Sequence, residues 1–414
     1  MTTDAAHTRP NPPRDLPRVL VVGSGLIGSV VAWRLASRGC PVTMITGDQS
    51  VHAASHVSAG MLAPVTETTF TETGLLGLNL ESLRRFGAFA DELAAASGAD
   101  PGLRRDPTLT VAATADDGAR LRDFNSFLTE QGLGGQLMTS RQLRATEPLL
   151  AAGMRTGLLV DSDLSCDNRM LWRALTIAAE RAGVHRRVGT VTELLTTGGR
   201  VTGARLTGGP GSGAADVTEE VTADVVVLAA GAWSGTIGSP VTIPVRPVKG
   251  QILRMRAGTL PALRQTVRAF SNGFEVYLVP RRHGEVVVGA TVEELGFDAT
   301  VTGEGAYGLL RDARTVVPVT AEYEVAEFNV GWRPGTPDNL PILGPSGVDG
   351  LVLATGHHRN GVLLTPITGD LIADLVCGGS IPEIAAPYTL ARFDTARFDT
   401  AGFDTARFRQ EGEA

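Results

Sequence analysis

Two arginines in the last quarter of the chain lie in segments rich in turn-forming residues, a setting suited to binding a small anion. Arg333 lies in GWRPGTPDNLPILG (residues 331–344). Arg359 lies in GHHRNGVLLTP (residues 356–366), which runs into an apolar helical pattern and places Arg359 beside Asn360 at a predicted helix start. A guanidinium group forms paired, charge-assisted hydrogen bonds with a carboxylate. The pattern favours this role for both arginines. The alternatives are a structural ion pair of Arg333 near Asp338 and loop anchoring by Arg359.

A glycine-rich turn near the start of the chain predicts a dinucleotide site. The sequence GSGLIG follows the apolar strand pattern of residues 19–22 and opens a helical pattern over residues 26–38, which is the context in which GxGxxG binds a pyrophosphate. Gly23 allows the tight turn, Gly25 lets the backbone approach the phosphates, and Gly28 allows the helix to pack on the strand. The helix N-terminus supplies free N–H groups. A glycine turn without a ligand is the structural alternative.

The segment after the second strand, residues 42–45, indicates which dinucleotide is bound. The acid that commonly binds ribose hydroxyls at this strand end is missing, and Thr46 and Gly47 stand there, with Asp48 as the nearest carboxylate. We expect Asp48, or Thr46 with backbone groups, to hold the ribose. The following loop, AASHVSAGMLAP (residues 53–64), consists of small residues on whose backbone a flat ring could lie. It favours a flavin, although a tight loop without a ligand would have the same composition.

Bulk properties exclude several other classes of protein. A formal charge of −7 over 414 residues argues against a nucleic-acid partner. Cys40, Cys166 and Cys377 lack metal-ligand spacing, so we expect reduced thiols and no metal. The sequence has neither a secretory h-region nor a run of about 18 apolar residues, which predicts a cytoplasmic protein with no membrane partner.

The length predicts two domains, because one core rarely extends beyond about 300 residues. Residues 223–230 and 351–354 are continuous apolar runs typical of strands buried on both faces, and they return the chain to the first sheet. Residues 75–150 have helical patterns and residues 243–330 have strand patterns, which suggests a second domain inserted twice. The expected division is a disordered leader (1–17), a discontinuous nucleotide domain (18–75, 151–240 and 335–385), a substrate domain (76–150 and 241–334), and a tail (391–414) whose RFDTA repeat predicts disorder or, alternatively, a docking peptide.

Several blocks in matching order resemble the FAD-dependent D-amino-acid oxidase superfamily, and within it the glycine oxidases of the thiamine-biosynthesis type. The similarity covers roughly residues 18–390. The blocks are VVGSGLIG, SAGMLAP, AAGAWS (229–234), RPVKGQILR (246–254), VYLVPR (276–281), VVVGAT (286–291), GWRPGTPDNLPILG and GHHRNGVLLTP.

The resemblance implies an α/β fold: an FAD-binding Rossmann-type domain of the glutathione-reductase type with an inserted antiparallel-sheet substrate domain. It implies non-covalent FAD, because no cysteine lies in the flavin-facing blocks. Departures from the family pattern are Ser24, the missing strand-end acid, and His358 in place of another aromatic residue. The cofactor-binding residues expected from the motif and the resemblance together are Gly23, Gly25, Leu26, Ile27, Gly28, Thr46, Gly47, Asp48, Ala54, Ser55, Ala59, Gly60, Met61, Val191, Gly231, His357, His358, Arg359, Asn360, Gly361, Val362 and Leu363.

The resemblance also implies the chemistry. Arg333, Arg359 and Tyr277 would bind and orient the carboxylate of a small amino acid, with a core position as the alternative for Tyr277. Hydride would pass to the flavin without a side-chain base, O₂ would reoxidise the flavin to give H₂O₂, and the imine would serve thiamine thiazole synthesis. Glycine is the expected substrate. The alternatives are a sarcosine or D-amino-acid oxidase or dehydrogenase and a redox-silent FAD-binding subunit, and the resemblance suggests a homotetramer.

Overall fold

The computed structural model describes residues 16–47, 50–69, 73–208, 218–271 and 274–393. The leader expected before residue 18 and the repeat tail lie almost entirely outside these ranges, as does Asp48.

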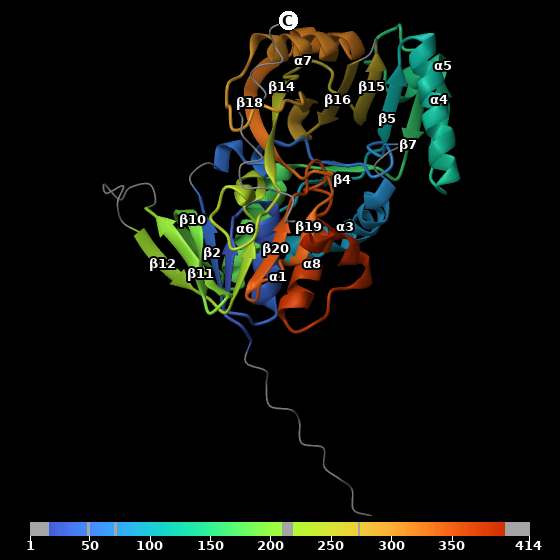
Figure 1. The fold of residues 1–414 in the computed structure, drawn as a ribbon. Coiled ribbons are helices and arrows are strands. Elements are labelled where there is room, and N and C mark those ends of the chain that lie inside the picture. The colour runs from blue at the N-terminus through green and yellow to red at the C-terminus, as the bar shows by residue number, and fades with distance from the viewer. Residues whose placement is uncertain (1–15, 48–49, 70–72, 209–217, 272–273, 394–414) are drawn as a thin grey trace, which may run out of the picture.

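A parallel sheet forms the lower half of the molecule in Figure 1. Its strand order is β19-β20-β13-β1-β2-β9, and only the edge strand β19 runs antiparallel to its neighbour. The strands span Ile342–Pro345 (β19), Leu351–Thr355 (β20), Val225–Leu228 (β13), Val19–Val22 (β1), Val42–Thr46 (β2) and His185–Val188 (β9). The expected βαβ unit is confirmed: β1 pairs in parallel with β2 through helix α1, Leu26–Ser37.

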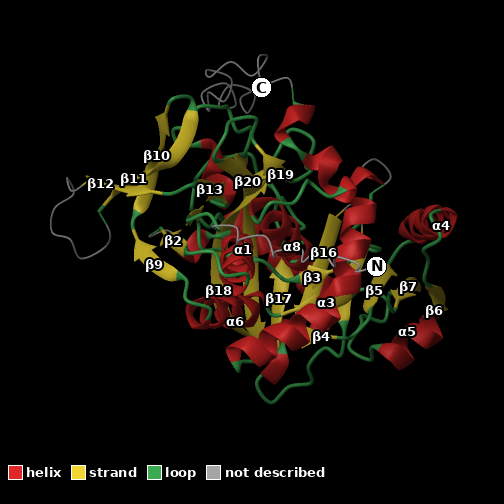
Figure 2. Ribbon diagram, turned by 90° about the horizontal axis from the view of Figure 1, so that it is seen from below, coloured by secondary structure: helices red, strands yellow, loops and turns green. Residues whose placement is uncertain are grey.

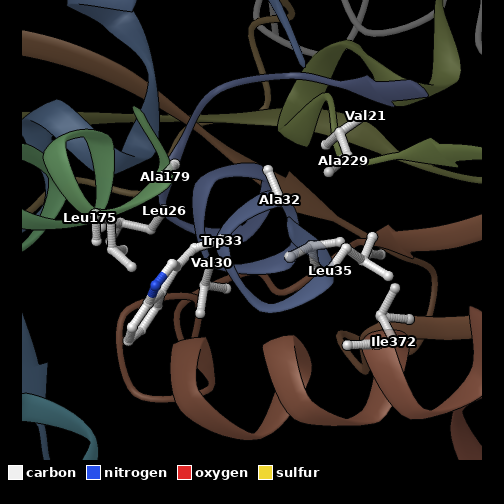
Figure 3. Close-up of a cluster of buried hydrophobic side chains, with 14 of the residues drawn as sticks. Val21, Leu26, Val30, Ala32, Trp33, Leu35, Leu175, Ala179, Ala229 and Ile372 are labelled. Atoms are coloured by element: carbon white, nitrogen blue, oxygen red, sulfur yellow. The ribbon is translucent and has the colours of Figure 1, made fainter. Parts of the chain in front are cut away.

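Both faces of this sheet are covered, which explains the continuous apolar runs. On one face, Val19 and Val21 join a core with helices α1, α3 (Leu76–Ser97) and α6 (Asn168–Arg181). In Figure 3, α1 lies among side chains that include Leu175 of α6 and Ile372 of α8, Thr365–Val376. On the other face, the intervening β1 residues pack against a small antiparallel sheet. Its strands are β10 (Thr190–Thr197), β11 (Arg200–Thr207) and β12 (Thr218–Thr222).

An eight-stranded sheet forms the upper half of the molecule in Figure 1, with the order β18-β14-β17-β16-β15-β5-β7-β6. Its pairs are antiparallel except β15 with β5, in agreement with the expected antiparallel-sheet domain. Helix α7 (Gly303–Val316) packs on β14 and β16. The strands are β18 (Glu324–Gly335), β14 (Arg246–Arg256), β17 (Glu285–Gly289), β16 (Phe274–Pro280), β15 (Thr266–Ser271), β5 (Thr108–Ala112), β7 (Thr156–Val160) and β6 (Gln136–Thr139).

Short elements join the two halves. Helix α2 (Ala54–Val57) contacts β18 and α6. Strand β3 (Met61–Leu62) follows α2 in the chain. It belongs to a three-stranded sheet with β8 (Leu164–Cys166) and β4 (Leu103–Arg104). Helices α4 (Ala115–Glu130) and α5 (Ser140–Thr146) lie at the opposite side of the molecule from β10–β12 (Figure 2).

The division into two domains stays a prediction, and two elements bear on where its boundaries belong. Helix α3, expected with the substrate domain, contacts α6 and α8, and its Phe86, Phe89 and Leu93 enter the core of the parallel sheet. Strand β7, expected with the nucleotide domain, pairs with β5 and β6 of the large sheet. Within the described ranges, no helix combines the length and apolar character needed to cross a bilayer.

Candidate flavin and substrate site

The glycine turn after β1 has the geometry that its motif predicts. Gly23 has φ +108°, a conformation that favours glycine, and a Cβ atom there would overlap the Ala229 carbonyl. A Cβ atom on Gly28 would overlap the Gly23 carbonyl, so α1 packs directly on the strand end. The turn is therefore built from close backbone contacts and not from side chains.

Beside this turn lies a cavity of about 270 Å³. At its floor, Ser55 Oγ accepts a hydrogen bond from the Leu26 N–H at 2.9 Å, and a Cβ atom on Gly25 would lie 2.8 Å from the same oxygen. The Ser55 hydroxyl is thus held at the N-terminus of α1, where the helix favours an anion.

Three buried polar atoms near this cavity lack a hydrogen-bond partner among the described residues. They are Thr46 Oγ1 at the end of β2, Ser58 Oγ and Trp332 Nε1. Buried polar groups in proteins are almost always paired, so a bound ligand with polar ribose and ring atoms would account for them. The glycine cradle, the N-terminus of α1 and these orphaned groups fit a flavin dinucleotide.

A second cavity, of about 320 Å³, opens between the large sheet and the loop of residues 57–61. The two cavities meet along one seam, because they share lining residues: Ala54, Ser58, Trp332, His358, Arg359 and Val362. A ligand bound in the second cavity would therefore lie next to a ligand bound at the shared end of the first cavity.

Arg333 lines the second cavity from strand β18. Its Nη1 donates to the carbonyl oxygens of Thr291 (3.1 Å) and Lys249 (3.4 Å). Asp338, the alternative partner considered from the sequence, pairs with Arg392 at 2.8 Å instead. Within the described ranges no carboxylate forms an ion pair with Arg333. Two neutral carbonyl groups orient the guanidinium, and its positive charge can therefore bind the carboxylate of a ligand.

Tyr277 lines the same cavity from strand β16. Burial raises the pKa of Tyr277, while neighbouring Arg333 acts in the opposite direction. The phenol therefore stays protonated at neutral pH and can donate a hydrogen bond beside the guanidinium. The ring also packs against the apolar cluster around Ile252 and Val279, so the substrate role of Tyr277 stays a prediction.

Two glycines on adjacent strands make room for these two side chains, and a third, Gly331, makes room for Val57 of α2. A Cβ atom on Gly289 (β17) would overlap the Tyr277 hydroxyl and ring. One on Gly250 (β14) would lie 2.5 Å from Arg333 Nη1, and Gly250 pairs across the sheet with Gly331 of β18. We call Gly250, Gly289 and Gly331 the glycine shelf. The sequence analysis missed it, although each glycine lies in a block that had been singled out.

An aromatic cluster at the seam was also missed. The Trp332 ring lies 4.9 Å from His52, 5.6 Å from Trp233 and 5.2 Å from Phe297, measured between ring centroids. The residues come from four separate parts of the chain, so only the fold brings them together. The cluster fixes the Trp332 ring between the two cavities and covers the seam with apolar surface.

The segment from Gly356 to Leu364 differs from the sequence expectation. Helix α8 begins only at Thr365, with Pro366 in its first turn, where proline is favoured. The prediction that the helix starts near Arg359 is therefore wrong, since residues 361–364 form turns. Backbone N–H groups of a turn, and not of a helix N-terminus, border the cavity here.

Two neutral histidines stand in that segment. His357 is buried, its Nε2 lies 3.1 Å from Thr368 Oγ1, and burial lowers its pKa to about 3. Burial, reinforced by Arg333 and Arg359, lowers the pKa of His358 to about 3 as well. The backbone N–H of His358 donates a hydrogen bond to the Pro334 carbonyl oxygen at 3.0 Å. Both rings are uncharged at pH 7, so the positive charge at the seam comes from the arginines.

The assignment of the individual cofactor and substrate residues stays a prediction, but the structure brings most of them together. Arg359 is exposed and lines both cavities, whereas Thr46, Asn360 and Leu363 line neither. Gly28 lies behind the glycine turn, and Asp48 lies outside the described residues. Those that line the first cavity are Gly23, Gly25, Leu26, Ile27, Gly47, Ala54, Ser55, Val191, Gly231, His357, His358, Arg359, Gly361 and Val362, whereas Ala59, Gly60 and Met61 line the second.

Comparison with known proteins gives the same picture. The chain is 34% identical over 383 residues to the glycine oxidase of Geobacillus kaustophilus, covering 90% of this chain and 96% of that protein. It is 34% identical to the bifunctional protein ThiO/ThiG of Nostoc sp. (strain PCC 7120), covering 86% of this chain and 52% of the relative. The chain thus spans about half the length of these bifunctional relatives.

Solved structures agree with the fold. The crystal structure of glycine oxidase from Geobacillus kaustophilus superposes with a TM-score of 0.80 at 30% identity, covering 91% of this chain and 99% of that one. The model of the FAD dependent oxidoreductase family matches residues 18–375, a span that includes both cavities. The chain therefore belongs to the FAD dependent oxidoreductase family.

Proposed function

We propose that this protein is an FAD-dependent amine oxidase that converts glycine, and small amino acids such as sarcosine, to the imine with release of H₂O₂. The imine would supply thiamine thiazole synthesis, as the resemblance implies. The observation that carries the proposal is Arg333: its guanidinium faces a cavity that adjoins the nucleotide groove, held by two carbonyls and by no carboxylate within the described ranges. Relatives that match along nearly their whole length are named glycine oxidase.

The chain's own residues would bind and orient the substrate. Arg333 and the protonated Tyr277 would both contact the carboxylate, and each hydrogen bond to a charged group contributes roughly 1.5–3 kcal/mol. Fixing the carboxylate on the sheet turns the α-carbon toward the seam, which lowers the entropic part of the barrier. Trp332 and Val362 at the seam would exclude water from the reacting C–H bond.

Bound FAD supplies the electron acceptor and the reaction with O₂, which no side chain can provide. Around it, the chain contributes a positive field. Arg333 and Arg359 line the second cavity, while the neighbouring His358 is neutral because its pKa lies near 3. A positive electrostatic field stabilises the ionised carboxylate of the amino acid. It also stabilises the negative charge that develops at the seam when electrons leave the substrate. Small amino acids and O₂ are the proposed partners, and a homotetramer is proposed by resemblance.

Neither of the two alternative functions is favoured by a separate structural observation. A sarcosine or D-amino-acid oxidase would use the same Arg333 and Tyr277 pair, so only turnover separates it from a glycine oxidase. A redox-silent FAD-binding subunit does not require a guanidinium directed into a cavity beside the flavin groove.

The test is a substrate panel with the purified holoprotein. Glycine, sarcosine, D-alanine and D-proline are compared by peroxide release in air and by anaerobic bleaching of the flavin absorbance. We expect glycine and sarcosine to bleach the flavin and give the highest kcat/KM. Turnover of D-proline far above glycine would move the assignment to a D-amino-acid oxidase. Absence of both bleaching and peroxide with every amine would support the redox-silent subunit.

A further inference from the structure

The only lysine of the chain is fully buried beside the proposed site and has no role in the function described above. Lysine and arginine together number 37, and Lys249 is the single lysine among them. Its side chain, on β14, is 0% exposed and lines neither cavity. An ammonium group is costly to bury unless charged partners compensate, so the partners of Lys249 indicate what it does.

The ammonium group of Lys249 joins strand β14 to the segment that follows β17, residues 291–298. Lys249 Nζ lies 2.5 Å from Asp298 Oδ2 and 3.4 Å from Glu293 Oε2. The backbones of Lys249 and Glu293 also exchange two hydrogen bonds, of 2.9 and 3.0 Å. The segment is therefore held on β14 by charge as well as by backbone pairing.

The two ends of this segment contact the substrate-binding arginine and the seam. At one end, the carbonyl oxygen of Thr291 accepts a hydrogen bond from Arg333 Nη1 at 3.1 Å. At the other end, the Phe297 ring lies 5.6 Å from Trp233 and 5.2 Å from Trp332, measured between ring centroids. A shift of the segment would therefore disturb both the guanidinium and the aromatic cluster.

Each carboxylate partner of the lysine stands beside one of these contacts. Glu293 is two residues after Thr291 and accepts a hydrogen bond from the Thr291 hydroxyl. Asp298 directly follows Phe297. Gln251 Nε2 also donates to Glu293 at 2.8 Å, so this acid has a neutral partner besides the ammonium group. One buried charge thus holds both ends of the segment.

Other contacts of the segment are weaker candidates for this task. Two of its apolar side chains face solvent, since Val292 is 70% and Leu295 is 54% exposed. Glu294 pairs with Arg246 of β14 at 2.9 Å, but both side chains are partly exposed, and such pairs contribute little. Removing one partner of a buried pair, in contrast, leaves an uncompensated charge and is strongly destabilising. The ion pairs of Lys249 are therefore the ones best placed to fix the segment.

We propose that Lys249 is a positioning residue for the substrate carboxylate. Its ammonium group, paired with Glu293 and Asp298, fixes the segment on β14. The segment in turn orients Arg333 through one carbonyl and places the Phe297 ring at the seam. Because Lys249 lines neither cavity, it acts only through this segment. The inference rests on the proposed function and deepens it, since it names the buried charge that keeps the substrate-binding arginine in place.

The experiment measures binding separately from turnover. Methoxyacetate is a small carboxylate without an amine, so it binds without being oxidised as an amine. Its dissociation constant is measured on the holoprotein from the perturbation of the flavin absorbance, for the wild type, Lys249→Met, Asp298→Asn and Glu294→Gln. Glu294→Gln is the matched control, because it neutralises the acid next to Glu293 in the same segment, and its ion pair with Arg246 is partly exposed.

We expect Lys249→Met to weaken methoxyacetate binding about ten- to a hundredfold, the range for a hydrogen bond to a charged group. Asp298→Asn should weaken it about fivefold. This second variant keeps the test open if Lys249→Met does not fold, because the Asp298 side chain is partly exposed. Glu294→Gln should keep the dissociation constant within about twofold of the wild type.

Anaerobic reduction by glycine separates positioning from a merely structural role. In Lys249→Met, or in Asp298→Asn, the apparent Kd for glycine should rise while the limiting rate of flavin reduction changes by less than about threefold. A lysine that only stabilises the fold would lower the urea midpoint and leave the ligand affinity of the FAD-loaded protein unchanged.

The results that would overturn the inference also separate it from the proposed function. Wild-type affinity for methoxyacetate in FAD-loaded Lys249→Met, or in Asp298→Asn, would overturn the role of Lys249 alone. An equal loss in Glu294→Gln would do the same, because any charge removed from the segment would then suffice. A wild type that does not bind methoxyacetate would overturn both the carboxylate site and the role of Lys249. Because binding needs no turnover, a protein inactive toward glycine would still give a clear answer.

Discussion

Substitution of Gly289 by alanine tests how the sheet positions the substrate-binding tyrosine. The added methyl group would overlap the hydroxyl and two ring carbons of Tyr277. An aromatic ring cannot fold aside as a flexible chain end can, so Tyr277 must rotate away from Arg333. The backbone of Gly289 has a conformation that alanine can adopt, since its φ is not in the left-handed region.

The magnitude follows from the lost contact. One hydrogen bond to a carboxylate is worth roughly 1.5–3 kcal/mol, which corresponds to about a ten- to a hundredfold rise in the KM for glycine. Flavin content should stay as in the wild type, because neither Gly289 nor Tyr277 lines the nucleotide cavity. Gly308→Ala is the matched control: Gly308 lies in α7 with open space around it, and we expect unchanged kinetics.

A double-mutant cycle isolates the mechanism. KM is measured by peroxide release for Gly289→Ala, Tyr277→Ala and the double variant. If the methyl group acts through Tyr277, it should change KM by less than about twofold once the ring is gone. Full additivity of the two effects would refute the argument, as would a Gly289→Ala enzyme with the wild-type KM.

Three further predictions concern the nucleotide half. Gly28→Ala should prevent stable FAD binding, because its Cβ atom would overlap the Gly23 carbonyl; the ratio of flavin to protein absorbance measures this, and Gly77→Ala on α3, where nothing lies within 4 Å, should leave it unchanged. Thr46→Val should raise the FAD dissociation constant about fivefold, since the orphaned Thr46 hydroxyl would lose a bond worth roughly 1 kcal/mol; an unchanged constant would assign the ribose to other groups. His357→Gln should flatten the acid side of the stability curve. In the wild type the folded pKa of His357 is about 3, below its ordinary value of 6.5, so the unfolded chain binds more protons and stability present above pH 6.5 is lost as the pH falls toward 3. The loss between pH 7 and pH 5 should be about 2 kcal/mol by urea unfolding, and an equal slope in the variant would contradict the assignment.

Local patterns predicted the geometry of the nucleotide turn, whereas the assignment of the substrate residues stays a prediction. Gly23 and Gly28 could be assigned from spacing because their roles depend on neighbours a few residues away. Tyr277 was assigned by resemblance and Arg333 from its turn-rich segment, and both line one cavity. Which group takes the place of the missing strand-end acid stays a prediction; the Thr46 hydroxyl, buried and unpaired among the described residues, is one candidate.

What the sequence could not provide depends on register between distant strands. The glycine shelf exists because Gly250 pairs with Gly331 and Gly289 with Tyr277, contacts that no single segment encodes. The Trp332 cluster is likewise a product of tertiary folding. The start of α8 was misplaced because an apolar run of turns precedes the helix, and hydrophobic periodicity alone does not separate the two.

The most direct test of the central claim is anaerobic reduction of the holoprotein by glycine in the stopped flow, for the wild type and Arg333→Ala. If Arg333 binds the substrate carboxylate, the variant should retain its FAD while the apparent Kd for glycine rises at least about a hundredfold, with Arg333→Lys in between. An Arg333→Ala protein whose flavin is reduced with the wild-type glycine dependence would contradict the account.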